Sequence, residues 1–250
     1  MPKQQTEEFG WPPVPRDRSN LPTKANANPT ADDVDFNKIW PTTDVVKQAQ
    51  EYVKQALSQE TYNHSLRVYC YGHTMVSQHF RDWIISVEGS FFETWALTCL
   101  FRDLATTPEN RNDTHLSFEF HGGFMALQRL QEFGAPKTQA ESVCEAIIRH
   151  QDPGETGMIT RLGQLVQLAT EFGLLAPELI NDADNMGFQP YLIHEDVIKQ
   201  VVEQHPRLKW SSCFAKTIKA EIEEKPWCHT TVLPTFAEDV AGNKLMAPYE

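Results

Sequence analysis

The stretch FFETWALTCLFRDLATT, residues 91–107, is apolar on nearly every side of a helix for about ten residues and then reaches Arg102 and Asp103. A helix of this kind belongs in the centre of a fold rather than at its surface. We therefore expect the charged pair at its end to be at least partly buried. Because buried charges need partners or a metal ion, this end of the helix is a candidate for chemistry.

Amphipathic patterns around this stretch predict further helices. Thr43 and Asp44 offer an N-cap to a segment whose apolar residues recur from Val45 to Leu57 at helical spacing. Alternating β-branched runs, which would indicate strands, are missing. We therefore predict an all-α bundle of about nine helices. The other helices are expected over residues 61–71, 73–87, 91–104, 116–133, 138–149, 158–171, 194–205 and 210–224, with long loops near 105–115, 150–157 and 173–190.

The distribution of proline divides the chain. Seven of the 16 prolines lie in the first 41 residues, among small and polar side chains. Such a composition is typical of an extended segment. We predict an N-terminal arm over residues 1–35, with Trp11 and Phe36 as candidates to hold it against the body, and a single domain over residues 36–250.

Composition excludes several classes of function. The 34 acidic residues outnumber the 22 Lys and Arg, which gives a net charge of −12 and disfavours a nucleic-acid-binding protein. No apolar run approaches the length of a membrane span. The five cysteines are scattered, as in a reducing compartment. We expect a cytoplasmic protein with a small-molecule substrate and neither a nucleic acid nor a membrane as partner.

Histidines and carboxylates near helix ends are the remaining candidates for chemistry, because phosphate-binding loops, GxSxG and HExxH are absent from the sequence. Collecting histidine and carboxylate from separate helices is how metal sites are built in helical bundles. A lone histidine on a helix is more often a packed residue, and we interpret six of the nine histidines that way. The candidates are His64, Asp103, His121, His150 and Asp184; the six others are His73, His79, His115, His194, His205 and His229.

Five segments, in order, carry a family resemblance. They are YNHSLRVYCYG (62–72), WALTCLFRDLATT (95–107), SFEFHGG (117–123), EAIIRHQD with GMIT (145–160) and SCFAKTIKAEIEEKPWCHTT (212–231). With them the chain resembles the cyanamide hydratase branch of the HD-domain superfamily from about residue 60 to 232. The resemblance implies an all-α fold and a lyase that adds water to a nitrile-type carbon. It also implies a Zn or Fe site, whose ligands carry over to His64, Asp103 and Asp184.

One position departs from the family pattern. Where the resemblance implies a His-Asp doublet, this sequence has Arg102 before Asp103. A guanidinium offers only donors, so it cannot replace imidazole as a ligand, and its charge repels a divalent cation. One hypothesis is that Arg102 takes the electrostatic place of the metal, neutralising Asp103 and Asp184. The resulting metal-free pocket would leave His64, His121 or His150 for proton transfer.

The consequences for function divide three ways. Without metal, the site would suit a dehydratase, isomerase or cyclase, which the family context would place in fungal secondary metabolism. Alternatively, family chemistry is kept, with Arg102 turned outward and His121 or His150 as a ligand, or with Arg102 as a substitution in an ordinary hydratase. A third hypothesis is a non-catalytic small-molecule binding module. Trp95, Phe101 and Phe118 are candidate pocket walls, and a homo-oligomer is compatible with the resemblance.

Overall fold

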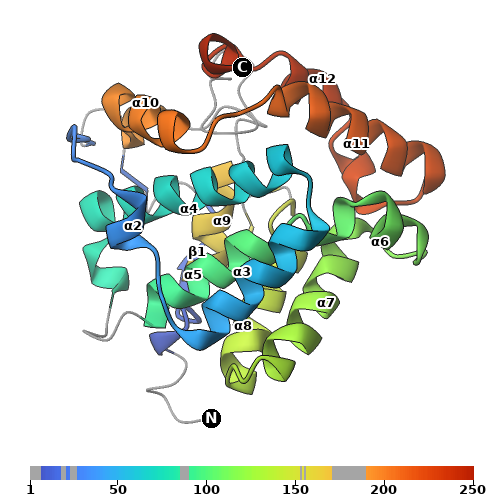
Figure 1. Ribbon diagram of the computed structural model, residues 1–250, viewed down its shortest axis with the longest axis horizontal. Coiled ribbons are helices and arrows are strands. Elements are labelled where there is room, and N and C mark those ends of the chain that lie inside the picture. The colour runs from blue at the N-terminus through green and yellow to red at the C-terminus, as the bar shows by residue number, and fades with distance from the viewer. Residues whose placement is uncertain are drawn as a thin grey trace.

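The computed structural model describes residues 7–17, 21–22, 27–84, 90–152, 154, 156–170 and 190–250. Within these residues the chain forms 11 α-helices and two three-residue strands, which confirms the predicted all-α class (Figure 1). The helices are α2 (Phe36–Ile39), α3 (Asp44–Ala56), α4 (Gln59–His79), α5 (Ser90–Phe101), α6 (Pro108–Asn112), α7 (Phe118–Glu132), α8 (Lys137–Ile148), α9 (Arg161–Thr170), α10 (Glu195–Gln204), α11 (Trp210–Glu224) and α12 (Phe236–Ala241); the strands are β1 (Pro13–Pro15) and β2 (Met158–Thr160).

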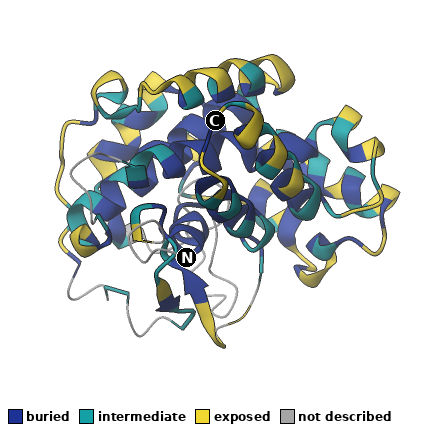
Figure 2. Ribbon diagram, turned by 90° about the horizontal axis from the view of Figure 1, so that it is seen from below, coloured by how far each residue is buried: buried dark blue, intermediate teal, exposed yellow. Residues whose placement is uncertain are grey.

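Helix α5 lies at the centre, as its sequence predicts. It packs against α3, α4, α7, α8 and α9. Its apolar side chains divide between two core clusters, one shared with α4, α9 and α10 and the other with α3, α7 and α8. A third cluster joins α11 to α12. The inner helices are accordingly buried while the outer ones expose one side (Figure 2).

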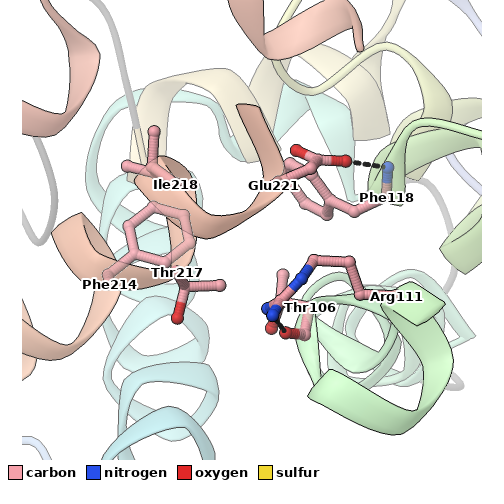
Figure 3. A pocket seen from close by; sticks show the side chains of 7 residues that line it. All are labelled: Thr106, Arg111, Phe118, Phe214, Thr217, Ile218 and Glu221. Carbon is pink, nitrogen blue, oxygen red and sulfur yellow. Dashed lines mark hydrogen bonds between the residues drawn. The ribbon is translucent and has the colours of Figure 1, made fainter. Parts of the chain in front are cut away.

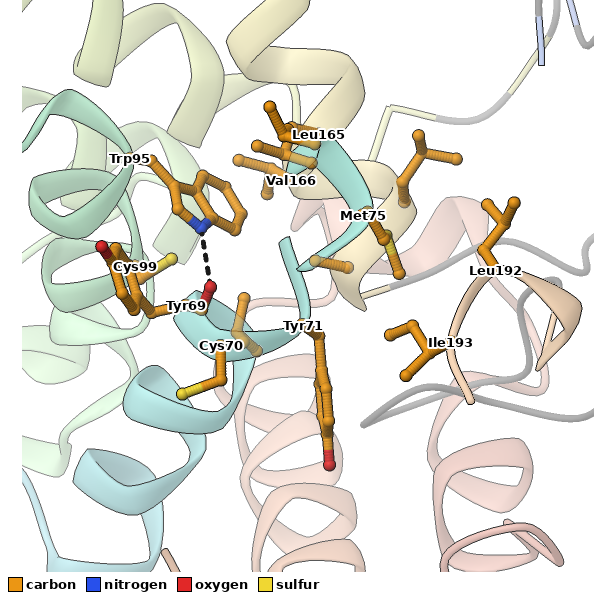
Figure 4. Packing of buried hydrophobic residues seen from close by; sticks show 14 of the residues in the cluster. Tyr69, Cys70, Tyr71, Met75, Trp95, Cys99, Leu165, Val166, Leu192 and Ile193 are labelled. Carbon is orange, nitrogen blue, oxygen red and sulfur yellow. Dashed lines mark hydrogen bonds between the residues drawn. The ribbon is translucent and has the colours of Figure 1, made fainter. Parts of the chain in front are cut away.

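Helix α4 corrects one prediction. The sequence suggested two helices that part at Gly72, but a single helix runs from Gln59 to His79. Gly72 is needed where the indole of Trp95 crosses α4, because a Cβ at this position would lie 2.3 Å from that ring. The indole Nε1 of Trp95 donates to the carbonyl oxygen of Tyr69, at 3.1 Å (Figure 4). This glycine therefore permits close helix packing rather than a break.

Two further boundaries differ from the predictions. The expected loop at 105–115 contains α6, whose N-cap Thr107 accepts from the backbone of Asn110. The helix expected from residue 158 begins at Arg161, because residues 158–160 form β2. This strand pairs antiparallel with β1, so the described part of the proline-rich segment contacts the body. Trp11 contributes as predicted, donating from Nε1 to the carbonyl oxygen of Thr138 at 3.1 Å.

Across the described residues, no helix combines the length and the hydropathy that crossing a bilayer requires.

Candidate functional site

A histidine, an arginine and an aspartate from two neighbouring helices meet in the interior. His64 lies within α4, while Arg102 and Asp103 follow the last residue of α5. The guanidinium Nη2 of Arg102 contacts Nε2 of His64 and donates to Oδ2 of Asp103 at 2.7 Å. Nε2 of His64 lies 3.5 Å from the same Oδ2. All three side chains are at most 1% exposed, so the pair at the end of α5 is buried as predicted.

Aromatic rings from α11 cover the imidazole. The ring of Trp210 stacks on His64 with centroids 4.1 Å apart and planes 15° from parallel. Phe214, one turn further along α11, stacks on Trp210 at 5.0 Å. Flat rings on one face fix the plane of the imidazole, so its nitrogen remains directed at Arg102 and Asp103.

His150 is a second buried imidazole near Arg102. Its Nδ1 lies 2.6 Å from the carbonyl oxygen of Ile147, which only accepts, so Nδ1 carries the proton and Nε2 keeps a lone pair. Burial first, and then the charge of Arg102, lowers the pKa of His150 to about 4, while Asp103 and Glu119 act in the opposite sense. His150 is therefore neutral near pH 7 and able to accept a proton.

Two polar atoms of the cluster lack partners. Within the described part of the chain, neither Nε of Arg102 nor Oδ1 of Asp103 makes a hydrogen bond, and both atoms are buried. Buried polar atoms are almost always paired in proteins, so unpaired ones indicate a place for a ligand or an ordered water. One is a donor and the other an acceptor, which suits a small polar molecule that can both accept and donate.

The remaining predicted residues lie in different places. His121 on α7 is half-buried; burial and the charge of Lys225 lower its pKa, with Asp113 opposing. Within the described residues, no hydrogen bond or ion pair joins His121 to Arg102 or Asp103. Asp184 lies outside the described residues. Trp95 and Phe101 are fully buried in the two core clusters on either side of α5.

Phe118 is the predicted pocket residue that lines a cavity. The cavity lies between α6, α7 and α11 and offers about 10 Å³ to the centre of a water-sized sphere, which is room for about one water molecule (Figure 3). Phe118 also meets the ring of His150 edge-on, with centroids 5.6 Å apart. Phe214, another wall of the cavity, stacks toward His64 with centroids 6.5 Å apart. The cavity thus borders the buried cluster on its aromatic side. Its walls are Thr106, Arg111, Phe118, Phe214, Thr217, Ile218 and Glu221.

The described residues do not fit a divalent metal ion. No group of three or more His, Cys, Asp or Glu side chains among them is arranged to hold one. The resemblance implies His64, Asp103 and Asp184 as ligands, and Asp184 lies outside the described residues. The other two each direct a side-chain atom, Nε2 of His64 and Oδ2 of Asp103, at the guanidinium of Arg102. A metal would have to displace a positive charge from both atoms.

Sequence reasoning missed three residues around the site, namely Trp210, Glu119 and His229. Glu119 is fully buried and its Oε1 lies 2.6 Å from Nδ1 of His229, a histidine that we interpreted as ordinary. The signal for Glu119 was present: it is an acid between two phenylalanines in SFEFHGG. Trp210 and His229 carried no comparable signal, because only the fold brings Trp210 to His64 and His229 to Glu119.

The fold and the site together define a class. An all-α bundle that brings a histidine from one helix against a carboxylate at the end of the next is the arrangement expected of an HD-domain protein. Curated proteins agree: the chain is 37% identical over 205 residues to cyanamide hydratase DDI2 of Saccharomyces cerevisiae, covering 81% of this chain and 84% of the yeast protein. Cyanamide hydratase DDI3 of the same yeast matches with the same figures. The chain belongs to the cyanamide hydratase family of HD-domain proteins. Comparison with protein-family models gives no match.

Proposed function

We propose that this protein is a hydro-lyase of the cyanamide hydratase family that works without a metal, adding water to a nitrile-type carbon of a small molecule or removing it. The observation that carries the proposal is the position of Arg102, whose Nη2 lies against His64 and Asp103 together. A guanidinium held there supplies permanent positive charge where negative charge would develop, in a site at most 1% exposed.

The residues divide the chemistry as follows. Oδ1 of Asp103 accepts a hydrogen bond from the water whose oxygen bonds to the carbon. The Nε–H of Arg102 donates to the nitrogen, which gains electron density as a carbon–nitrogen π bond breaks. One water proton moves to Nε2 of neutral His150 and then to that nitrogen, so His150 ends as it began. The remaining hydroxyl proton then shifts from oxygen to nitrogen, which converts the isourea-type adduct into urea when the substrate is cyanamide. His64 and Trp210 keep the guanidinium oriented.

Metal content of the purified full-length protein tests the first half of the proposal. We expect substoichiometric Zn and Fe in the unmodified chain by mass spectrometry, and no loss of activity after dialysis against EDTA. Arg102→His is the matched variant, because it supplies an imidazole in place of the guanidinium and should raise bound metal severalfold. Stoichiometric Zn or Fe in the unmodified chain would overturn the proposal.

Cyanamide is the probe for the second half, since the two yeast relatives are cyanamide hydratases. We expect urea to form at a rate that Asp103→Asn lowers at least 100-fold, because the neutral amide polarises the attacking water less than the carboxylate does and leaves the charge of Arg102 uncompensated. The surface variant Asp44→Asn, at an exposed position on α3, is the control. Urea formation that both variants leave unchanged would contradict this assignment of the site.

A second candidate is a dehydratase, isomerase or cyclase for a flat organic molecule. The aromatic side chains beside the cluster favour it: Trp210 and Phe214 stack over His64, and Phe118 meets His150 edge-on. Such walls suit a planar ring better than a three-atom nitrile. This function predicts no urea from cyanamide, together with quenching of Trp210 fluorescence by planar aromatic acids or lactones, and Trp210→Leu should abolish that quenching.

A further inference from the structure

A second pocket lies where the N-terminal arm meets the end of α4. It offers about 620 Å³ to the centre of a water-sized sphere, whereas the cavity beside the buried cluster has room for about one water molecule. A space of several hundred cubic ångströms is typical of a site for a small organic molecule. We call it the arm pocket; its walls include Val14, Leu21, Phe80, Asp82, Trp83 and Arg161.

Helix α4 separates the arm pocket from the cluster. His64 lies in the second turn of α4, whereas Gln78 and His79, two further walls of the pocket, are the last residues of the helix. At a rise of about 1.5 Å per residue, the distance from His64 to His79 along the helix is about 22 Å. A small molecule in the arm pocket therefore does not touch His64.

Two opposite charges in the walls are available to a ligand. Nη1 of Arg161 donates to the backbone carbonyl oxygen of Asp82 at 3.2 Å, so the two residues are neighbours. Within the described residues, Nε of Arg161 is buried without a partner, and no ion pair engages either the guanidinium or the carboxylate of Asp82. A guanidinium has five N–H donors, so Arg161 has donors left for a carboxylate. Asp82 is exposed, and its carboxylate is left for a cation.

The other polar walls are already engaged. The amide of Gln78 accepts from the backbone N–H of Thr30 at 3.2 Å and donates to the carbonyl oxygen of the same residue at 3.1 Å. Nε2 of His79 lies 3.0 Å from the carbonyl oxygen of Leu192, to which it donates. Arg161 and Asp82 are thus the charged groups that a ligand would meet.

Apolar side chains form the rest of the pocket and are held in place. The rings of Phe80 and Trp83 are each 4% exposed and stack with centroids 4.4 Å apart. The backbone N–H of Trp83 donates to the carbonyl oxygen of Phe80 at 2.8 Å. Val14 is fixed by the pairing of β1 with β2, where it lies opposite Ile159. The pocket therefore joins a preformed apolar surface to one positive and one negative group.

We propose that the arm pocket binds a small zwitterion of the amino-acid type with an apolar side chain. The carboxylate of the ligand accepts from Arg161, its ammonium group donates to Asp82, and its side chain lies against Trp83 and Val14. Charge-assisted hydrogen bonds of this kind are the strong ones in proteins. A zwitterion has no net charge, so the net charge of −12 does not oppose its approach, as it would for a simple anion. This site does not depend on the proposed function.

Calorimetric titration of the full-length protein with three related probes tests the charge pattern. L-Phenylalanine carries both charges, 3-phenylpropionate lacks the ammonium group and 2-phenylethylamine lacks the carboxylate. We expect L-phenylalanine to bind with a Kd of about 1 mM or lower, and each of the others about tenfold more weakly, because each loses one charge-assisted hydrogen bond. Equal affinity for all three probes, or no binding of L-phenylalanine at about 10 mM, would overturn the proposal.

Variants assign each charge to its residue. Arg161→Gln should weaken L-phenylalanine about tenfold and leave 2-phenylethylamine unchanged, whereas Asp82→Asn should weaken L-phenylalanine to a similar extent and leave 3-phenylpropionate unchanged. Arg81→Gln is the matched control, because it removes a positive charge directly beside Asp82 from a residue that is not a wall of the pocket. Should Arg161→Gln fail to fold, Asp82→Asn still decides, since Asp82 is exposed. An equal loss in Arg81→Gln, or no loss in Asp82→Asn, would overturn the site.

Methyl NMR locates the bound probe. On addition of L-phenylalanine we expect the methyl signals of Val14 and Leu21 to move, because both residues are walls of the arm pocket. The signals of Ile218, a wall of the cavity beside the cluster, should stay in place. Movement of Ile218 without movement of Val14 would place the ligand at the cluster and contradict the assignment.

Discussion

Two regions of this molecule surround buried arginines with histidine and carboxylate side chains, but the hydrogen bonds of the arginines differ; we call these regions the two arginine neighbourhoods. At the corner between α10 and α11, defined here as residues 205–211, Arg67 donates from Nη1 to the carbonyl oxygen of His205 at 3.0 Å. In the same corner Arg207 donates from Nε to Glu250 and from Nη2 to Ser211, both at 2.9 Å. The other neighbourhood is the cluster of Arg102 with Asp103 and His64.

The difference lies in which atoms are left over. Arg207 uses Nε as well as Nη2, with Glu250 as one partner and Ser211, four residues further along the chain, as another. Arg102 concentrates its contacts on Nη2 and leaves Nε unpaired in the described structure, beside an unpaired oxygen of Asp103. Satisfied buried arginines hold a fold together, whereas an unsatisfied donor and acceptor are retained where something else must bind.

Removing the carboxylate partner of each arginine gives the largest expected contrast. In Asp103→Asn the charge of Arg102 stays buried without compensation, which should lower the free energy of unfolding by about 3–5 kcal/mol. Glu250→Gln should cost less, about 1 kcal/mol, because the buried guanidinium of Arg207 keeps its hydrogen bond to the hydroxyl of Ser211 and the amide oxygen of glutamine can still accept from it. Urea denaturation followed by circular dichroism measures both. Equal losses in the two variants would remove the distinction between the neighbourhoods.

Acid should destabilise both neighbourhoods through their histidines. The pKa of His150 and that of His205 are each lowered to about 4, first by burial and then by Arg102 and Arg67 respectively. Between pH 6.5 and 4 the unfolded chain binds more protons than the folded one, so stability is lost as pH falls through this window. At pH 5 each histidine should cost about 2 kcal/mol relative to pH 7.5.

The matched variants His150→Gln and His205→Gln separate the two contributions. Each variant should reduce the change in the urea midpoint between pH 7.5 and pH 5. Part of that change should persist in both variants, because burial also lowers the pKa of His73 to about 4. Only His150→Gln should also alter urea formation from cyanamide. A variant His150→Gln with unchanged acid sensitivity would show that this imidazole is not held neutral.

Much of the fold can be predicted from the sequence because the buried side chains of a helix recur along the chain at helical spacing. The run around Trp95 and Leu100 predicts the central helix, and the pattern from Val46 to Val53 predicts α3. The helix boundary expected at Gly72 was wrong. From the sequence alone, a glycine that ends a helix cannot be distinguished from one that makes room for an indole ring of another helix. The pairing of β1 with β2 was missed for a related reason, since three residues are too few to show alternation.

The site is less accessible to sequence reasoning. His64 and Asp103 were predicted to converge, and they do; the role of Arg102 in place of a metal stays a prediction. Trp210 over His64 and His229 beside Glu119 depend on how α11 and the segment after it cross the bundle. No spacing along the chain encodes such contacts between distant segments. Whether His121 takes part remains a prediction, and Asp184 lies outside the described residues.

Replacing arginine by lysine in each neighbourhood should give the smallest change and the sharpest comparison. Lys keeps the charge but lacks the planar fork, so Arg102→Lys loses the simultaneous contact with His64 and Asp103. We expect a loss of about 1 kcal/mol, as for one hydrogen bond, together with at least a tenfold fall in urea formation. Arg67→Lys should cost a similar amount without a kinetic effect, because its partners are backbone carbonyls of the corner. If Arg102→Lys kept full activity, charge alone would suffice at this position, and the donor geometry of Arg102 would not be part of the chemistry.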